Sequence, residues 1–281
     1  MNAYRPPKGQ PKTEKHLGLL VSQYAEASGL GVRRVRQRVS AMVFVGALER
    51  VREEDSAARF LIKGGMACEL RFQGKARATQ DLDAVFHGSL DDLLDDLDAA
   101  FAEPYSGFSF SYAEPEPIRE TGSHRLELKL QYAGRSWATL RVEVSRPEGR
   151  AHEPETVPAL SVSQFGLSGP REVTCLSLRY QIAQKIHACT ERFEERENER
   201  VHDLLDLLLM EDLIADLAQV KDACLEIFEL RTGPHWPPTL SAEPSWPAIY
   251  ARLAAEIDFP ITELPEAQAG VQALIDRIAN A

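Results

Sequence analysis

Two neighbouring segments alternate apolar and polar residues with a period of two, and this pattern constrains the fold of the 281-residue chain more than any other. Leucines alternate with polar residues over 126–131, and the alternation returns over 138–145 after a turn at Ala133-Gly134-Arg135. Successive side chains of a strand point to opposite faces, so each segment has one apolar and one polar face. The pattern predicts a β-hairpin with one face buried, and it places Glu143 on the polar face.

Another strand is predicted over residues 81–86, with the sequence Asp-Leu-Asp-Ala-Val-Phe. Asp81 and Asp83 are two residues apart and project from the same face, while Leu82 and Ala84 point into the core. Two such carboxylates can hold one or two Mg²⁺ ions, which bind proteins through a few carboxylates together with substrate phosphates. Glu143 could join them as a third carboxylate; the alternative is an ordinary solvent-facing residue.

A glycine pair, Gly64-Gly65, follows Lys63 and precedes a predicted short helix over residues 66–72. The free backbone N–H groups and the dipole at a helix N-terminus favour anions. A phosphate cradle together with metal-binding carboxylates predicts an enzyme that acts on a nucleoside triphosphate (NTP). The cofactor expected from this chemistry is Mg²⁺, with Mn²⁺ as a substitute.

The second half of the chain is predicted to be helical, with one helix over 177–193 and another over 201–210. Lys185 lies beside the apolar stripe of the first helix, so it either directs its ammonium at a specific group or extends to water above a packed stem. Asp203 and Asp206 lie one turn apart on the second helix, away from its leucines. In isolation, such a pair is typical of a solvated helix face.

Composition and charge narrow the function further. The net charge of −11 argues against broad nucleic-acid binding. Four arginines nevertheless form a compact basic patch, which is either a binding surface or an ordinary solvated helix face. The four scattered cysteines predict reduced core residues in a cytoplasmic protein. The chain shows no apolar run near the ~20 residues of a membrane span and no signal-peptide core. The patch residues are Arg33, Arg34, Arg36 and Arg38, and the cysteines are Cys68, Cys175, Cys189 and Cys224.

Changes in composition along the chain suggest three parts. Residues 1–16, rich in proline and lysine, are predicted to be a flexible tail. Residues 17–165 contain the predicted strands and carboxylates, and residues 166–281 contain the second set of helices.

Four short motifs occur in a fixed order: Lys63-Gly64-Gly65, Arg77-x-Thr79-x-Asp81-x-Asp83, Lys185-Ile-His-Ala and Arg200-Val-His-Asp203-Leu-Leu-Asp206-Leu. This order resembles the AbiEii/MenT-like nucleotidyltransferase toxins, a branch of the DNA polymerase β-type nucleotidyltransferase superfamily. The region from Cys224 to Leu253 is also similar to the C-terminal part of that family. The resemblance therefore covers most of the chain.

The resemblance implies an α+β fold, with a mixed β-sheet flanked by helices and a helical C-terminal lobe. It also implies a role for each motif residue. Gly64 and Gly65 would contact the triphosphate, Asp81 and Asp83 would bind Mg²⁺, and Glu143 would be the third carboxylate. Lys185 would neutralise the triphosphate, and Asp203 would orient or support it. The chemistry of the transfer adds Lys63 and Arg77 as cations at the NTP, and Thr79 as either a structural or a phosphate-contacting hydroxyl. The sequence departs from the wider pattern at Gly65, often a serine in the superfamily, and at His202, often a lysine.

The function implied is that of the toxin of a toxin–antitoxin pair, which transfers NMP from an NTP to an acceptor such as the tRNA 3′ end and releases pyrophosphate. The basic patch would then contact the tRNA backbone, and an antitoxin would be a further partner. Two alternatives stay open. The same site could nucleotidylate a protein or a small molecule of the aminoglycoside kind, or the chain could be an inactive nucleotide-binding module.

Overall fold

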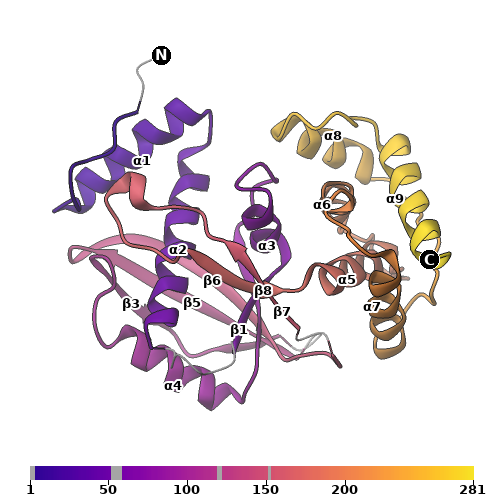
Figure 1. Cartoon of the computed structure of the whole chain (residues 1–281), viewed down its shortest axis with the longest axis horizontal. Coiled ribbons are helices and arrows are strands. Elements are labelled where there is room, and N and C mark those ends of the chain that lie inside the picture. Colours follow the sequence, from indigo (N-terminus) through magenta and orange to yellow (C-terminus); the bar gives the residue numbers. More distant parts are fainter. Residues whose placement is uncertain (1–3, 52–58, 119–121, 151–152) are drawn as a thin grey trace. The chain divides into compact units, whose positions relative to one another are not determined.

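The computed structural model describes residues 4–51, 59–118, 122–150 and 153–281 (Figure 1). The chain forms two compact units from interleaved segments. The first unit comprises Met1–Met66, Ala78–Arg146 and Thr156–Cys175, and the second comprises Ala67–Arg77, Pro147–Glu155 and Leu176–Ala281. The division predicted from sequence, with one boundary between residues 165 and 166, used continuous segments. It therefore did not assign residues 67–77 and 147–155 to the second unit, or residues 166–175 to the first.

One mixed β-sheet is the centre of the first unit. Its eight strands run in the order β3-β5-β6-β2-β1-β8-β7, and β4 also pairs with β5. Strand β2 is antiparallel to β1 and parallel to β6. The strands are β1 (Phe60–Lys63), β2 (Asp81–Phe86), β3 (Phe108–Tyr112), β4 (Glu116–Ile118), β5 (Ser123–Tyr132), β6 (Arg135–Ser145), β7 (Pro154–Pro158) and β8 (Glu172–Leu176).

The predicted hairpin is confirmed as the antiparallel pair β5–β6. Its turn residues, Ala133 and Gly134, have φ angles of 48° and 73°. Positive φ at both central positions is the signature of a type I′ turn, whose twist matches that of the flanking strands. The leucines of β5 are buried as the alternation predicts, with Leu128 fully covered.

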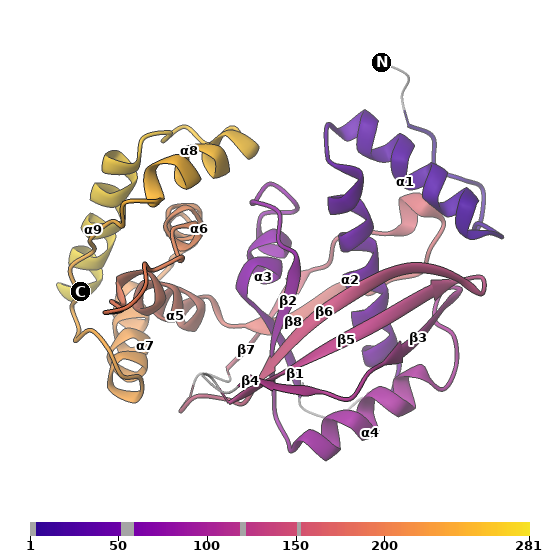
Figure 2. The same ribbon diagram turned by 180° about the vertical axis from the view of Figure 1, so that it is seen from behind.

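Helices α1 (Glu14–Ser28), α2 (Val32–Val51) and α4 (Leu90–Phe101) complete the first unit, with a short 3₁₀ turn η1 (Ser163–Phe165). A capping box between Ser89 and Asp92 starts α4. Helix α2 packs against both α4 and β6, so these two helices cover the apolar face of the sheet (Figure 2). The other face of β2 and β6 carries the charged residues.

The second unit is a helical bundle, as predicted. Helix α6 contacts α5, α8 and α9, and α7 packs on α5 and α9. Two aromatic residues of α8, Trp246 and Tyr250, are fully buried in this core. The helices are α5 (Leu178–Thr190), α6 (His202–Glu211), α7 (Leu217–Leu230), α8 (Trp246–Glu256) and α9 (Leu264–Ala279), while α3 (Gly64–Arg71) begins in the first unit and ends in the second.

The N-terminal segment has specific contacts within the first unit. The hydroxyl of Tyr4 donates to the carbonyl of Gln164 at 2.7 Å, and its ring packs edge-on against Tyr24 and Phe165. The hydroxyl of Tyr132 donates to the carbonyl of Pro11. Residues 1–3 of the predicted tail lie outside the described residues.

Two further sequence predictions can be compared with the structure. All four cysteines are buried, as predicted for core residues, and none of them forms a disulfide. In the part of the chain that the structure describes, no helix combines the length and the apolar character needed to cross a bilayer.

Candidate functional site

The three predicted carboxylates lie on neighbouring strands of the sheet. Strand register pairs Asp83 of β2 with Lys63 of β1 on one side and with Glu143 of β6 on the other. Paired residues of adjacent strands share a face, and Asp81 lies two residues before Asp83 on that same face. The sequence therefore folds so that Asp81, Asp83 and Glu143 project together from the polar side of the sheet.

Gly64 makes room for the carboxylate of Asp83. A Cβ atom at position 64 would lie 2.1 Å from Oδ2 of Asp83, a distance no real contact allows. The φ angle of Gly64 is also +63°, in the left-handed region that favours glycine. Glycine is thus required here both by backbone conformation and by the close approach of Asp83 to the N-terminus of α3.

Asp81 has a buried acceptor that no group in the described part of the chain satisfies. Its Oδ1 atom is shielded from solvent and has no hydrogen-bond partner among the described residues. Buried polar atoms are nearly always paired, so an unpaired carboxylate oxygen calls for a ligand or a cation. The neighbouring Thr79 hydroxyl donates to the backbone carbonyl of Asp81 at 3.1 Å, which gives Thr79 a structural role.

Glu143 and Lys63, at the two ends of this row, already have partners. Oε1 of Glu143 accepts from Nε and Nη2 of Arg125 at 3.1 and 2.6 Å, while Nζ of Lys63 donates to Oγ of Ser145 at 2.7 Å. Within the described residues, no group of three His, Cys, Asp or Glu side chains is arranged to hold a metal ion. Glu143 is therefore engaged by Arg125, whereas Asp81 keeps a buried oxygen without a partner among the described residues.

A second cluster of predicted site residues lies inside the helical unit. Nζ of Lys185 is 2.7 Å from Oδ1 of Asp203 and 2.7 Å from Oδ2 of Asp206. Lys185 is only 4% exposed and both aspartates are 0% exposed. The alternatives of a water-seeking lysine and of a solvated aspartate pair are therefore wrong.

Arg77 belongs to the same cluster. Its Nε and Nη2 atoms donate to the two carboxylate oxygens of Asp206 at 3.0 and 2.8 Å, a bidentate pair. Arg200 donates from Nε to Oδ2 of Asp203 at 2.7 Å. Asp206 is the functional-looking residue that the sequence prediction of the site omitted, although its spacing of three from Asp203 was a usable signal.

Charge in this cluster is fixed by mutual pairing. Burial would lower the pKa of Lys185, but the negative charges of Asp203 and Asp206 outweigh burial and raise that pKa above its ordinary value. Burial would raise the pKa of Asp203, yet Arg200 and Lys185 hold it well below its ordinary value. The pKa of Asp206 is likewise lowered, against burial, by Lys185 and Arg77. All of these groups are charged at neutral pH.

His202 contributes no charge at neutral pH. Burial lowers the pKa of His202 to about 4, despite the nearby carboxylate of Asp203. Two anions, Asp203 and Asp206, are thus bonded by three cations, Arg77, Lys185 and Arg200. A lysine at position 202 would have added another.

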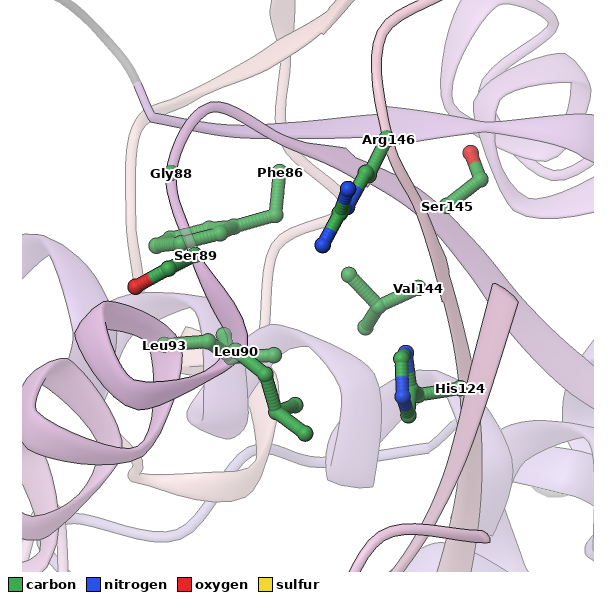
Figure 3. A pocket seen from close by; sticks show the side chains of 9 residues that line it. All are labelled: Phe86, Gly88, Ser89, Leu90, Leu93, His124, Val144, Ser145 and Arg146. Carbon is green, nitrogen blue, oxygen red and sulfur yellow. The ribbon is translucent and has the colours of Figure 1, made fainter. Parts of the chain in front are cut away.

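None of the predicted site residues lines the pocket of the first unit drawn in Figure 3, although Ser145 in its wall accepts a hydrogen bond from Lys63. Its apolar wall includes Phe86 and Val144, which point to the face of the sheet opposite Asp83 and Glu143. His124 and Arg146 approach it from the strand side (Figure 3). The pocket therefore shares no lining residue with the carboxylates, and Ser145 is the residue that connects it to Lys63.

Comparisons with known proteins identify the family and the fold of this chain. Residues 46–277 match the family described as "Nucleotidyl transferase AbiEii toxin, Type IV TA system". MenT4, a nucleotidyltransferase toxin from Mycobacterium tuberculosis H37Rv, has a similar fold, with a TM-score of 0.63 and 16% sequence identity over 94% of this chain and 90% of that chain. The comparison with curated proteins gave no match.

Two other solved structures are much less similar. The Megavirus polyadenylate synthase has a TM-score of 0.24 and 9% identity, over 99% of this chain and 51% of its own. The nucleotidyltransferase CdnG of Bradyrhizobium diazoefficiens, solved with GTP, also has a TM-score of 0.24, with 16% identity over 96% and 87% of the two chains. The match over residues 46–277 shows that this chain belongs to the AbiEii family of nucleotidyltransferase toxins.

Proposed function

We propose that the chain transfers NMP from an NTP to a cellular acceptor, with Asp81 and Asp83 holding Mg²⁺ or Mn²⁺ at the start of β2. The observation that carries the proposal is the buried, unpaired Oδ1 of Asp81 beside a second carboxylate that Gly64 accommodates. Carboxylate oxygens are the ligands Mg²⁺ prefers, so these residues fit the metal. When bound, the metal supplies charge stabilisation for the phosphoryl oxygens and activates the acceptor hydroxyl.

The residues around the carboxylates have distinct proposed roles. Gly64 and Gly65 offer backbone N–H groups at the N-terminus of α3 to the phosphates, and Lys63 adds a positive charge at the end of β1. Glu143, whose Oε2 is not bonded to Arg125, serves as a further ligand or as the base that takes the acceptor proton. Pyrophosphate is the leaving group, and its charge is met by these cations and N–H groups.

In the helical unit, we propose that Lys185 and Arg77 contribute positive charge toward the triphosphate. The support is the direct bonding of both cations to buried carboxylates, together with family membership. Asp203 and Asp206 then keep the two cations ionised and fixed. This role differs from that of a free lysine, because each cation is already bonded to a carboxylate.

The proposed acceptor is the 3′ end of tRNA, and the proposed partner is a cognate antitoxin, with action in the cytoplasm. Family membership supports the antitoxin, and the distribution of charge supports the RNA. Residues 1–38 contain eight Lys and Arg but two Asp and Glu, although the whole chain has a net charge of −11. A basic end on an acidic protein favours a polyanionic acceptor at that end.

A transfer assay tests this proposal. The full chain is incubated with each α-³²P-labelled NTP, Mg²⁺ and a cell extract, and the label is followed into RNA, protein and small molecules. Label in tRNA that is lost with EDTA and with Asp83→Asn supports the proposal. Label in protein or a small molecule would move the acceptor to the alternative class, and absence of label with every NTP would refute the activity.

A further inference from the structure

The arginine-rich start of α2 has partners that sequence alone did not suggest. Nη2 of Arg33 donates to Oε1 of Gln80 at 3.0 Å, and Nε2 of Gln37 donates to the backbone carbonyl of Gln80 at 2.6 Å. Gln80 directly precedes Asp81. Two side chains from one helix therefore hold the residue next to the first metal carboxylate.

Strand β2 needs such support at this end. The pairing of β1 with β2 stops at Lys63 and Asp83. Among the described residues, Asp81 therefore has a neighbouring strand on the β6 side alone, where it pairs with Arg141. Strand ends with one neighbour open more readily than the centre of a sheet. The support from α2 acts at the position where support from β1 is missing.

Helix α2 is itself fixed to the sheet through Trp137 of β6. The guanidinium carbon of Arg36 lies 4.1 Å from the centre of the Trp137 ring, and Nη1 of Arg36 donates to the Trp137 carbonyl at 2.9 Å. The indole Nε1 donates to Oγ of Ser40 at 3.1 Å. Arg33, Gln37 and Ser40 are spaced by four and three residues, so they share one face of the helix.

The position of the Asp81 carboxylate depends on its backbone. Because its buried Oδ1 has no hydrogen-bond partner among the described residues, that oxygen is not oriented by a side-chain contact. We infer that Arg33 and Gln37 are positioning residues, which place Asp81 for metal binding by holding Gln80. The inference rests on the proposed function of Asp81, and it assigns Arg33 to the carboxylate site instead of the RNA backbone.

The test compares the full-length protein with Gln37→Glu, which keeps the side-chain shape but removes the donor to the Gln80 carbonyl. Loss of an outer contact to a metal ligand typically changes metal affinity or activity 10- to 100-fold. We expect Gln37→Glu to raise the Mn²⁺ concentration for half-maximal transfer about 10-fold, with the KM values for NTP and acceptor changed less than about 2-fold. Gln37→Lys, which retains a donor, should recover most of this loss.

Gln23→Glu is the matched control, because Gln23 is an exposed glutamine on α1. Amide hydrogen exchange over residues 79–83 provides a second readout and should be faster in Gln37→Glu than in the control. If Gln37→Glu and Gln23→Glu give the same metal curve and exchange rate, the inference is overturned and the proposed function stands. If the wild-type protein shows no metal-dependent transfer, both are overturned.

Discussion

The two pairs of aspartates in this protein differ in their burial and in their hydrogen-bond partners. Asp81 and Asp83 lie on the polar face of a sheet, partly exposed, and the buried oxygen of Asp81 has no partner among the described residues. Asp203 and Asp206 are fully buried, and each accepts from two cationic side chains. A carboxylate left unsatisfied is suited to a ligand, whereas one saturated by cations is suited to holding those cations in place. This contrast predicts different consequences of mutation.

The largest effect is expected for Asp81→Asn and Asp83→Asn. Each variant should lower transfer at least 10³-fold, because loss of a metal ligand removes several kcal/mol of transition-state stabilisation. Thermal unfolding should change by no more than a few degrees, since no hydrogen bond to Oδ1 of Asp81 is broken. Asp91→Asn, at an exposed aspartate of α4, is the control. Transfer at the wild-type rate by the double variant would end the metal assignment.

The next largest effect is expected for Asp206→Ala, on stability. Removing this carboxylate leaves Arg77 and Lys185 with uncompensated charge inside the helical unit. Breaking a buried ion pair from one side costs about 3–5 kcal/mol, which urea unfolding monitored by circular dichroism can measure. Asp212→Ala, at an exposed position just after α6, should cost less than about 0.5 kcal/mol. Equal costs for the two variants would contradict the contrast drawn above.

Gly64→Ala tests whether the backbone at position 64 determines the position of the Asp83 carboxylate. The added Cβ would meet Oδ2 of Asp83 at 2.1 Å, so this carboxylate must move. A displacement of about 1 Å in a catalytic group can lower turnover on the order of 10²-fold. Gly31→Ala, where a Cβ meets nothing within 4 Å, provides the control. Steady-state kinetics would contradict the prediction if both variants turned over alike.

The smallest effect concerns pH. Burial, with help from Arg231, lowers the pKa of His187 to about 4, while the ordinary value is 6.5. The free energy of unfolding therefore includes the full contribution of neutral His187 above pH 6.5. As pH falls from 6.5 through 4, the unfolded chain takes up a proton more readily than the folded one, and about 1–3 kcal/mol of that free energy is lost. The aspartates of the cluster, whose pKa values are lowered from 3.8, keep their contribution until pH drops below that value. Urea unfolding at pH 7, 5.5 and 4.5 measures the difference.

His187→Gln should flatten the stability profile between pH 6.5 and 4.5, because glutamine does not titrate. The outcome that counts against this reading is an unchanged slope in the variant. In that case the acid sensitivity would belong to other groups, such as His202, whose pKa is also about 4.

Local patterns predicted the elements that carry the site, because each depends on residues close in sequence. The alternation of β6, the Asp-x-Asp spacing of β2 and the glycine start of α3 all appear at their predicted places. The short strands were not predicted: β7 and β8 have too few residues for an alternation to stand out, and β7 lies in a segment rich in proline. Their place in the sheet depends on partners distant in sequence.

Side-chain partners were the part of the site that the sequence could not supply. Nothing local to Glu143 shows that Arg125 binds it, since the two lie on different strands and meet through register. The burial of Asp206 was also hidden, because an aspartate on a leucine-rich helix usually faces water. The basic patch was predicted from charge alone, whereas Arg33 and Arg36 are bonded to the sheet unit.

The interleaving of the two units has a practical consequence for dissecting this toxin. Residues 67–77 leave the first unit directly after the glycine pair and return shortly before Asp81, and they deliver Arg77 to its buried partner on the way. No single break in the polypeptide releases either half intact. A fragment ending before residue 176 would retain Arg77 without Asp206, so expression of separate halves is expected to give insoluble material instead of an autonomous catalytic core.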